Sequence, residues 1–232
     1  MKTGVVLYFA VAICGFALTN AGDSEKLDLD GALMDMKAKV ANIMTFNVVQ
    51  LTQVRSFVAY AGAVARVHLD TMISSATNNT RTAAHKFKSE GKNVDYCVQR
   101  VIIELEKKKL EIDSEFTWCT HASQDRLFNS FAISTKILNE GYRIIAMIKM
   151  ILSICHGQLF GVHDCITRRG KRMKEYIKCF EEKDAWYPKY RKMVSAEISH
   201  NIGVCLSRET ADAAAKIAFA KRMGEKCLDQ AT

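Results

Sequence analysis

The chain has 232 residues, 25% of them charged and 49% hydrophobic, and it carries a formal net charge of +8. This apolar content is ordinary for a globular protein and excludes disorder as the main state. A single proline and the lack of runs that alternate apolar and polar residues exclude a sheet-rich protein. The sequence therefore predicts an all-α fold, a disulfide-stapled antiparallel bundle of long helices preceded by a long N-terminal amphipathic helix.

The first 21 residues have the pattern of a secretory signal peptide. Lys2 gives a positive start, an apolar run extends from Val5 to Ala17, and Ala21 ends a small-x-small cleavage site. A membrane anchor, the alternative, needs about 20 apolar residues, more than this run offers. We expect cleavage after Ala21 and a secreted, extracellular protein.

Residues 22–91 are predicted to form a polar leader, one long helix and a polar connector. Apolar residues recur in steps of three or four from Leu33 to Ala76, and Asn47 interrupts that stripe. Such a helix can be a coiled-coil dimerisation arm or can pack on the rest of its own chain. The scarcity of flanking charges favours packing within the chain, and a homodimer stays open.

Asn78-Asn79-Thr80 is a glycosylation sequon at Asn78. It lies in a polar run that we interpret as a loop between helices. We expect Asn78 to carry a glycan in a secreted protein.

Residues 92–232 are predicted to form a cysteine-rich helical domain organised by two equal spans. Cys97 and Cys119 are 22 residues apart, as are Cys205 and Cys227. A helix advances about 33 Å over that distance, whereas a disulfide needs Cα atoms within about 7 Å. Each of the four cysteines must therefore bond to a cysteine on a different element.

Two sets of disulfides satisfy this requirement. Chain reversals at Gly141 and near Pro188 favour Cys119–Cys165, Cys179–Cys205 and Cys97–Cys227, and this set is preferred because it uses six cysteines. The alternative is a two-rung ladder of Cys97–Cys227 and Cys119–Cys205. Removal of Cys14 with the signal peptide leaves seven of the eight cysteines, so one thiol stays free or pairs between chains. We assign the free thiol to Cys155, in the most apolar helix.

The sequence offers no catalytic or cofactor-binding constellation, and we predict that the protein is not an enzyme. A zinc site at Cys155-His156 and His163-Asp164-Cys165 is conceivable, but the spacing fits no zinc pattern and oxidising conditions favour disulfides. We therefore predict no metal site and no cofactor.

A basic run extends from Arg168 to Lys174. It has three interpretations: a solvated face, a site for an anionic surface, or a dibasic cleavage site. Secretion argues against nucleic acid as a partner. The apolar segment 142–160 contains Arg143 and Lys149 and is too short to span a membrane, so no transmembrane segment is expected.

The cysteine layout resembles the TsetseEP-type domain of insect secreted proteins. Two cysteine pairs with the same spacing flank a middle cluster, and aromatic residues lie near the first pair, over residues 94–228: Cys97, Cys119, Cys155, Cys165, Cys179, Cys205, Cys227, Tyr96 and Phe116. The resemblance implies a secreted, disulfide-bonded helical domain of an insect gut or body fluid, with no catalytic residues to carry over.

We expect a non-enzymatic extracellular protein that acts in binding or structural interaction. Its partner would be an extracellular protein or an anionic surface. The alternative is a carrier of a small apolar ligand or lipid, held in the interior around Met147 and Met150.

Overall fold

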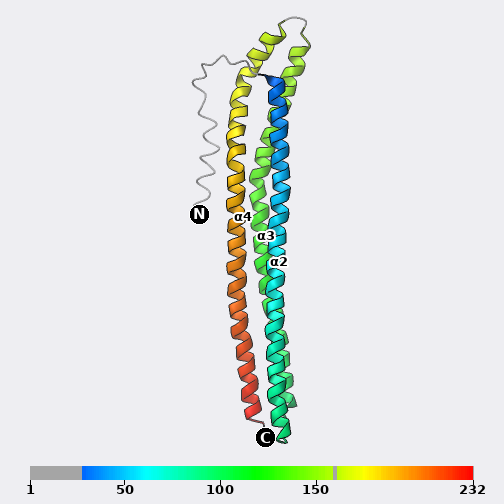
Figure 1. The fold of residues 1–232 in the computed structure, drawn as a ribbon, viewed down its shortest axis with the longest axis vertical. Helices are drawn as coiled ribbons and strands as arrows, with labels where there is room; N and C mark the ends of the chain where they lie inside the picture. The colour runs from blue at the N-terminus through cyan, green and yellow to red at the C-terminus, as the bar shows by residue number, and fades with distance from the viewer. Residues whose placement is uncertain (1–27, 159–160, 232) are drawn as a thin grey trace. The chain divides into compact units, whose positions relative to one another are not determined.

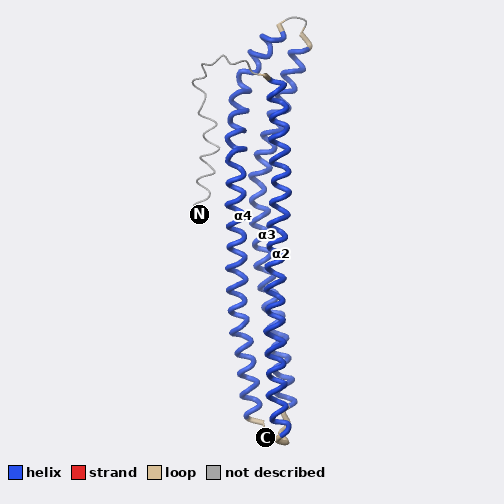
Figure 2. Tube along the Cα trace, in the orientation of Figure 1, coloured by secondary structure: helices blue, strands red, loops and turns tan. Residues whose placement is uncertain are grey.

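The computed structural model describes residues 28–158 and 161–231. These residues form three long helices, α2 (Leu29–Ser89), α3 (Asp95–His156) and α4 (Val162–Asp229), and include no strand (Figure 1, Figure 2). The prediction of an all-α, disulfide-bonded helical bundle is confirmed. The predicted signal peptide, residues 1–21, lies outside the described residues.

Local signals fix the ends of α2. At its start, the Asp28 carboxylate accepts hydrogen bonds from the backbone N–H groups of Asp30 and Gly31, as an N-cap residue does. At its end, Gly91 has a φ of 81° and Lys92 N–H donates to the Phe87 carbonyl. This is a Schellman motif, which needs a residue in the left-handed region that glycine adopts without strain.

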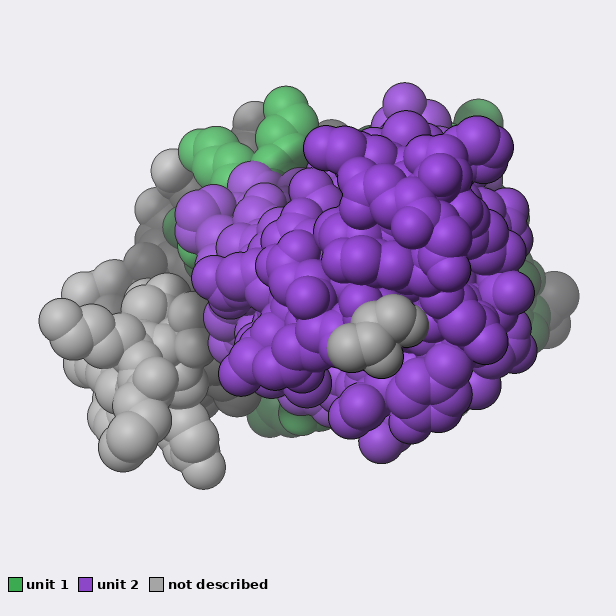
Figure 3. All heavy atoms as spheres, turned by 90° about the horizontal axis from the view of Figure 1, so that it is seen from below, with its two compact units in different colours: residues 1–50, 130–194 green, residues 51–129, 195–232 purple. Residues whose placement is uncertain are grey.

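The described chain divides into two compact units, coloured separately in Figure 3. Unit 1 comprises residues up to 50 and residues 130–194, and unit 2 comprises residues 51–129 and residues from 195 onward. Each unit contains one segment of each of the three helices. All three helices contribute to both units, and the predicted domains 22–91 and 92–232 stay a prediction.

Unit 1 has an extensive apolar core. Its buried members come from all three helices and recur at helical spacing: Leu29, Met36, Val40, Ile43, Ile137, Ile144, Ile145, Ile148, Ile151, Leu152, Cys155, Cys165, Met173, Phe180 and Tyr187. Burial of side chains of this size contributes about 1.5 to 3 kcal/mol each in transfer free energy. This core determines how the segments of unit 1 pack.

Gly141 is buried in this core, within α3. The predicted chain reversal at this residue is wrong, because α3 continues through it to His156. A Cβ at Gly141 would lie 2.5 Å from Val40 Cγ2 and 2.8 Å from Phe180 Cε2. Glycine therefore serves close packing of α3 against α2 and α4 here, and the chain turns after His156.

Pro188 lies inside α4, and the predicted chain reversal near this residue is also wrong. An internal proline costs a helix about 3 kcal/mol. Phe180 and Tyr187 lie two turns apart on α4, before the proline, and are at most 1% exposed. The ring of Trp186 stacks on the ring of Tyr190. Burial of these aromatic side chains in unit 1 offsets the cost and carries α4 through the proline.

Unit 2 combines its own apolar core with two disulfides. Its fully buried side chains on α3 include Leu105, Ile112 and Phe116, and Ile202 on α4 is also fully buried. Near the end of α4, Ala84, Val94, Cys97 and Leu228 form a small separate apolar cluster. The packing is tight enough that a Cβ at Gly62 would lie 2.8 Å from Thr120 Cγ2.

Candidate functional site

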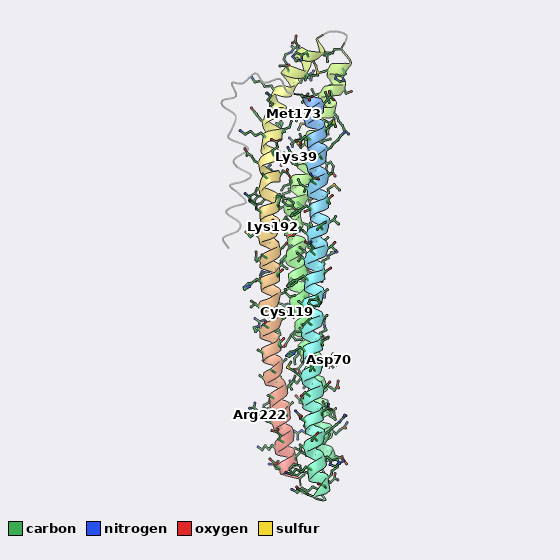
Figure 4. All side chains as sticks on the ribbon, in the orientation of Figure 1. Lys39, Asp70, Cys119, Met173, Lys192 and Arg222 are labelled. Atoms are coloured by element: carbon green, nitrogen blue, oxygen red, sulfur yellow. A yellow bond between two sulfur atoms is a disulfide. The ribbon has the colours of Figure 1, made fainter. Side chains whose placement is uncertain are left out.

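Three disulfides lie among the described residues. Cys97–Cys227 and Cys119–Cys205 join α3 to α4 in unit 2, with Cα–Cα distances of 5.6 and 5.9 Å (Figure 4 labels Cys119). This is the two-rung ladder that follows from the equal spans. The preferred hairpin set is wrong in its Cys119–Cys165 and Cys179–Cys205 bridges, because it required a reversal at Gly141 that α3 does not make.

The third disulfide joins Cys155 to Cys165 in unit 1, with a Cα–Cα distance of 5.6 Å. The assignment of Cys155 as the free thiol is therefore wrong. The turn between α3 and α4 brings the two cysteines together across a sequence separation of 10. No cysteine of the described chain is free, and Cys179 too is disulfide-bonded.

The Cys155–Cys165 disulfide uses both cysteines of the zinc motif considered above. Its two sulfur atoms are bonded to each other and are not available as thiolate ligands. A second acidic group, Glu115, Glu209 and Asp212 in unit 2, is near enough in space to consider for a metal. Lys216 pairs with Glu115 and Asp212 at 3.1 and 2.6 Å, and Arg208 pairs with Glu209 at 2.6 Å, so each of these carboxylates already has a cationic partner.

Asn78 is exposed and lies within α2, not in a loop. The Thr80 hydroxyl of the same sequon is buried and donates to the Ala76 carbonyl at 3.0 Å. The expected loop is wrong because α2 continues to Ser89. Glycosylation of Asn78 stays a prediction, and it would have to precede formation of this helix.

The basic run lies in the first turns of α4, in unit 1. Arg168, Arg169, Lys171 and Arg172 are exposed, whereas Met173 is buried. The charges therefore form a solvated helix face, the first of the three interpretations. The same exposed face can also meet an anionic surface.

The described part of each unit has a groove on its surface. In unit 1 an open groove of about 390 Å³ is bordered by Asp35, Lys178 and Glu181. Partial burial disfavours the charged form of the nearby Lys39, but hydrogen bonds to Asp35 and Glu181 at 2.5 and 2.6 Å outweigh it and raise the pKa of Lys39. Two carboxylates that border this groove, Asp35 and Glu181, are therefore already paired with Lys39.

The groove of unit 2 is smaller, more enclosed and more apolar, at about 210 Å³. Val101, Phe219 and Met223 line it beside the Cys97–Cys227 bridge. Glycine at position 224 keeps room between α4 and Val101, because a Cβ there would collide with the Val101 side chain. Sites for drug-sized ligands span about 300 to 1,000 Å³, so this groove suits only a small apolar group.

Of the two methionines predicted to line a ligand-binding interior, only Met147 faces the interior. Met147 packs against the core of unit 1, but Met150 is 56% exposed. Met150 is therefore a surface side chain and not part of an interior cavity.

An exposed apolar stripe lies on α2 in unit 2. Phe57, Tyr60, Val64 and Val67 are 44%, 70%, 49% and 65% exposed and are spaced by three, four and three residues. At 100° per residue the stripe is centred about 130° around the helix from the buried residues Val54, Val58, Ala65 and Leu69. One helix thus has two apolar faces, of which only one contacts the unit's own core.

A polar layer crosses the apolar core of unit 1. It consists of Asn47, Ser130, Ser134, Tyr187 and Arg191, all at most 7% exposed. Asn47 Oδ1 accepts hydrogen bonds from the hydroxyl groups of Tyr187 and Ser134, which also contact each other. Burial raises the pKa of Tyr187, although its hydrogen bonds and the charge of Arg191 oppose the shift.

Arg191 is the charged member of this layer and is fully buried. Nη1 donates to Ser130 Oγ at 2.6 Å, and the guanidinium carbon lies 4.4 Å from the centroid of the Phe131 ring. Nε and Nη2 have no hydrogen-bond partner. Sequence analysis identified the break at Asn47 but not its partners, because nothing in the spacing of Tyr187 or Arg191 distinguishes them from surface residues near a proline.

No family model matches this sequence, and neither the curated proteins nor the solved structures compared with it give a significant match. The membrane prediction can be compared with the structure alone: none of the helices in the described ranges has a stretch apolar enough to cross a bilayer.

Proposed function

We propose that this chain is a secreted, non-enzymatic helical protein that binds a protein partner through the exposed apolar stripe of α2. The single observation that carries the proposal is the stripe Phe57-Tyr60-Val64-Val67. Isolated apolar side chains are common on protein surfaces, but four in coiled-coil register form a continuous face. Such a face gains free energy when a second apolar helix covers it.

A second copy of the chain is the partner that the chemistry of the stripe favours. Ser56 and Ala63 lie beside Tyr60 on the helix surface, and their small side chains allow a second helix to approach closely. The stripe contains no charged residue, so two copies would meet without repulsion between like charges. Association of the two copies would then depend on the fit of their surfaces and on the apolar area that they bury.

Extracellular action is supported by chemistry of a different kind. Disulfides persist in oxidising compartments and are rare in the cytosol, and three join residues of the described chain. The signal-peptide pattern of residues 1–21 points the same way. Membership of the TsetseEP-type family and an insect origin belong to this proposal and rest on the cysteine layout and the aromatic residues near its first pair.

Light scattering of the secreted protein across a concentration series tests the proposal. We expect a monomer–dimer equilibrium that Val64→Glu abolishes, because a buried glutamate would face the apolar stripe of the partner. Val204→Glu is the matched control, since Val204 is 55% exposed on α4 of the same unit and lies outside the stripe. Equal effects of the two substitutions would contradict the stripe as the binding surface.

If the wild-type chain stays monomeric at all concentrations, the second copy is excluded as partner. Crosslinking from a photoreactive residue at position 60 in the native fluid would then identify a different protein partner. Absence of any crosslinked protein would reject the proposed function.

A small apolar ligand is the second candidate, favoured by the groove beside Cys97–Cys227. Native mass spectrometry of protein from its natural source would show the bound mass. Val101→Phe would fill the groove and displace such a ligand, whereas Val204→Phe on the exposed surface would not.

A further inference from the structure

Arg191 presents an edge of its guanidinium that nothing in the described chain occupies. Nη1 is used by Ser130 Oγ, and the flat face of the group lies against Phe131. The two nitrogens without a partner, Nε and Nη2, point along the same edge of the fork. This is the edge with which arginine binds an anion by two parallel hydrogen bonds.

The charge of Arg191 also has no counterion among the described residues. Its guanidinium stays protonated in proteins. No carboxylate of these residues pairs with it, and the rest of the polar layer consists of an amide and hydroxyl groups. Tyr187 does not supply a negative charge either, since burial keeps its phenol protonated. The interior of unit 1 therefore contains one uncompensated positive charge.

Buried charges in native proteins are paired, and removal of the partner of a buried charge is strongly destabilising. Water could satisfy the two N–H groups but would leave the charge uncompensated. A monovalent anion satisfies both requirements. Arg191 is fully buried and lines neither of the grooves described above, which favours a small ion over a large organic molecule.

We propose that the polar layer of unit 1 binds one small monovalent anion of the size of chloride, held by Nε and Nη2 of Arg191. The anion completes the hydrogen bonding of the guanidinium and neutralises its charge. Because the site exists only in the folded unit, binding is coupled to folding. The proposal is independent of the stripe on α2 and of its partner.

Thermal unfolding of the full secreted chain at constant ionic strength tests the site, with sodium chloride replacing sodium gluconate. Above the dissociation constant, we expect the melting temperature to rise by about 3 to 5 °C for each tenfold increase in chloride. Arg191→Met should abolish this dependence, since methionine fills similar space without charge. Lys192→Met is the matched control, because Lys192 is the adjacent residue and is exposed (labelled in Figure 4).

An equal chloride dependence in wild type and Arg191→Met would overturn the proposal, because it would reflect general screening. So would a wild-type melting temperature that does not change with chloride. A melting temperature that rises with acetate but not with chloride would show that the site binds a carboxylate and would overturn the assignment.

A second measurement does not depend on the folding of any variant. Crystals of the wild-type protein grown in bromide should show an anomalous peak within hydrogen-bond distance of Nε and Nη2 of Arg191. Water at that place, with no anomalous signal, would reject the anion site.

Discussion

Units 1 and 2 use the same three helices but are stabilised in different ways. Unit 2 joins α3 to α4 by two disulfides that enclose long stretches of chain, with sequence separations of 130 and 86. Unit 1 contains the Cys155–Cys165 bridge across a short turn, with a separation of 10, a further disulfide-bonded cysteine, Cys179, and a polar layer within its apolar core. Both units bury apolar side chains from all three helices, so they differ in the length of chain that the described bridges enclose and in the buried polar layer of unit 1.

The largest expected effect is on the disulfides. Cys119→Ala with Cys205→Ala should lower the free energy of unfolding by roughly 4 to 5 kcal/mol, and Cys155→Ala with Cys165→Ala by roughly 2 to 3 kcal/mol, because a longer loop constrains the unfolded chain more. Urea unfolding followed by circular dichroism measures both. Equal losses would show that loop length does not govern the difference between the units.

The next effect concerns glycines at close helix contacts. Gly141→Ala in unit 1 should destabilise the protein by about 1 to 3 kcal/mol, since its Cβ would press on Val40 and Phe180. Gly203→Ala on α4 is the control, because nothing lies within 4 Å of a Cβ there. That control should stabilise the protein by about 0.5 to 1 kcal/mol through helix propensity. A neutral Gly141→Ala would mean that the core of unit 1 adjusts easily.

The polar layer gives a third prediction. Tyr187→Phe leaves Asn47 and Ser134 without a hydroxyl partner and should cost about 1 to 3 kcal/mol at neutral pH. Tyr176→Phe on the same helix is the control, since Tyr176 is 42% exposed. Urea unfolding of the three proteins measures the difference. A similar small loss in both variants would show that the layer adds little to unit 1.

The same layer predicts a dependence on alkaline pH. The pKa of Tyr187 is raised in the folded state, so the folded protein keeps this proton at a pH where the unfolded chain releases it. The stability from Tyr187 is therefore fully present below its ordinary pKa of 10.0 and is lost as pH rises through the folded value. Urea unfolding between pH 9 and pH 11 should show a smaller decline in Tyr187→Phe than in wild type. Parallel declines would contradict the shift.

The smallest effects belong to ion pairs between helices. Arg66 and Asp113 of unit 2 pair at 2.5 Å with side chains 40% and 48% exposed, and Lys183 and Glu140 of unit 1 pair at 2.6 Å with side chains 19% and 35% exposed. Double-mutant cycles with Arg66→Met and Asp113→Asn, and with Lys183→Met and Glu140→Gln, should give coupling energies below about 1 kcal/mol. High salt should weaken the more exposed pair of unit 2 more. The reverse order would show that exposure does not set screening here.

The sequence alone determined the fold class and one disulfide, Cys97–Cys227, which both candidate sets contained. Apolar residues at helical spacing predicted long helices, because this period is a property of each segment by itself. The equal spans of Cys97–Cys119 and Cys205–Cys227 defined the two-rung ladder as one of two solutions. Spacing also identified Asn47 as a break in an apolar stripe, since a polar residue at a buried position is visible in the pattern.

Only the tertiary structure decided where the helices end and which cysteines meet. Gly141 and Pro188 are ordinary helix breakers, but burial of Phe180 and Tyr187 in unit 1 outweighs the local cost, so α3 and α4 continue through them. The turn then falls near Gly161, which places Cys155 beside Cys165. The orphaned edge of Arg191 was equally invisible, because the burial of a charged side chain depends on segments of chain far away in sequence.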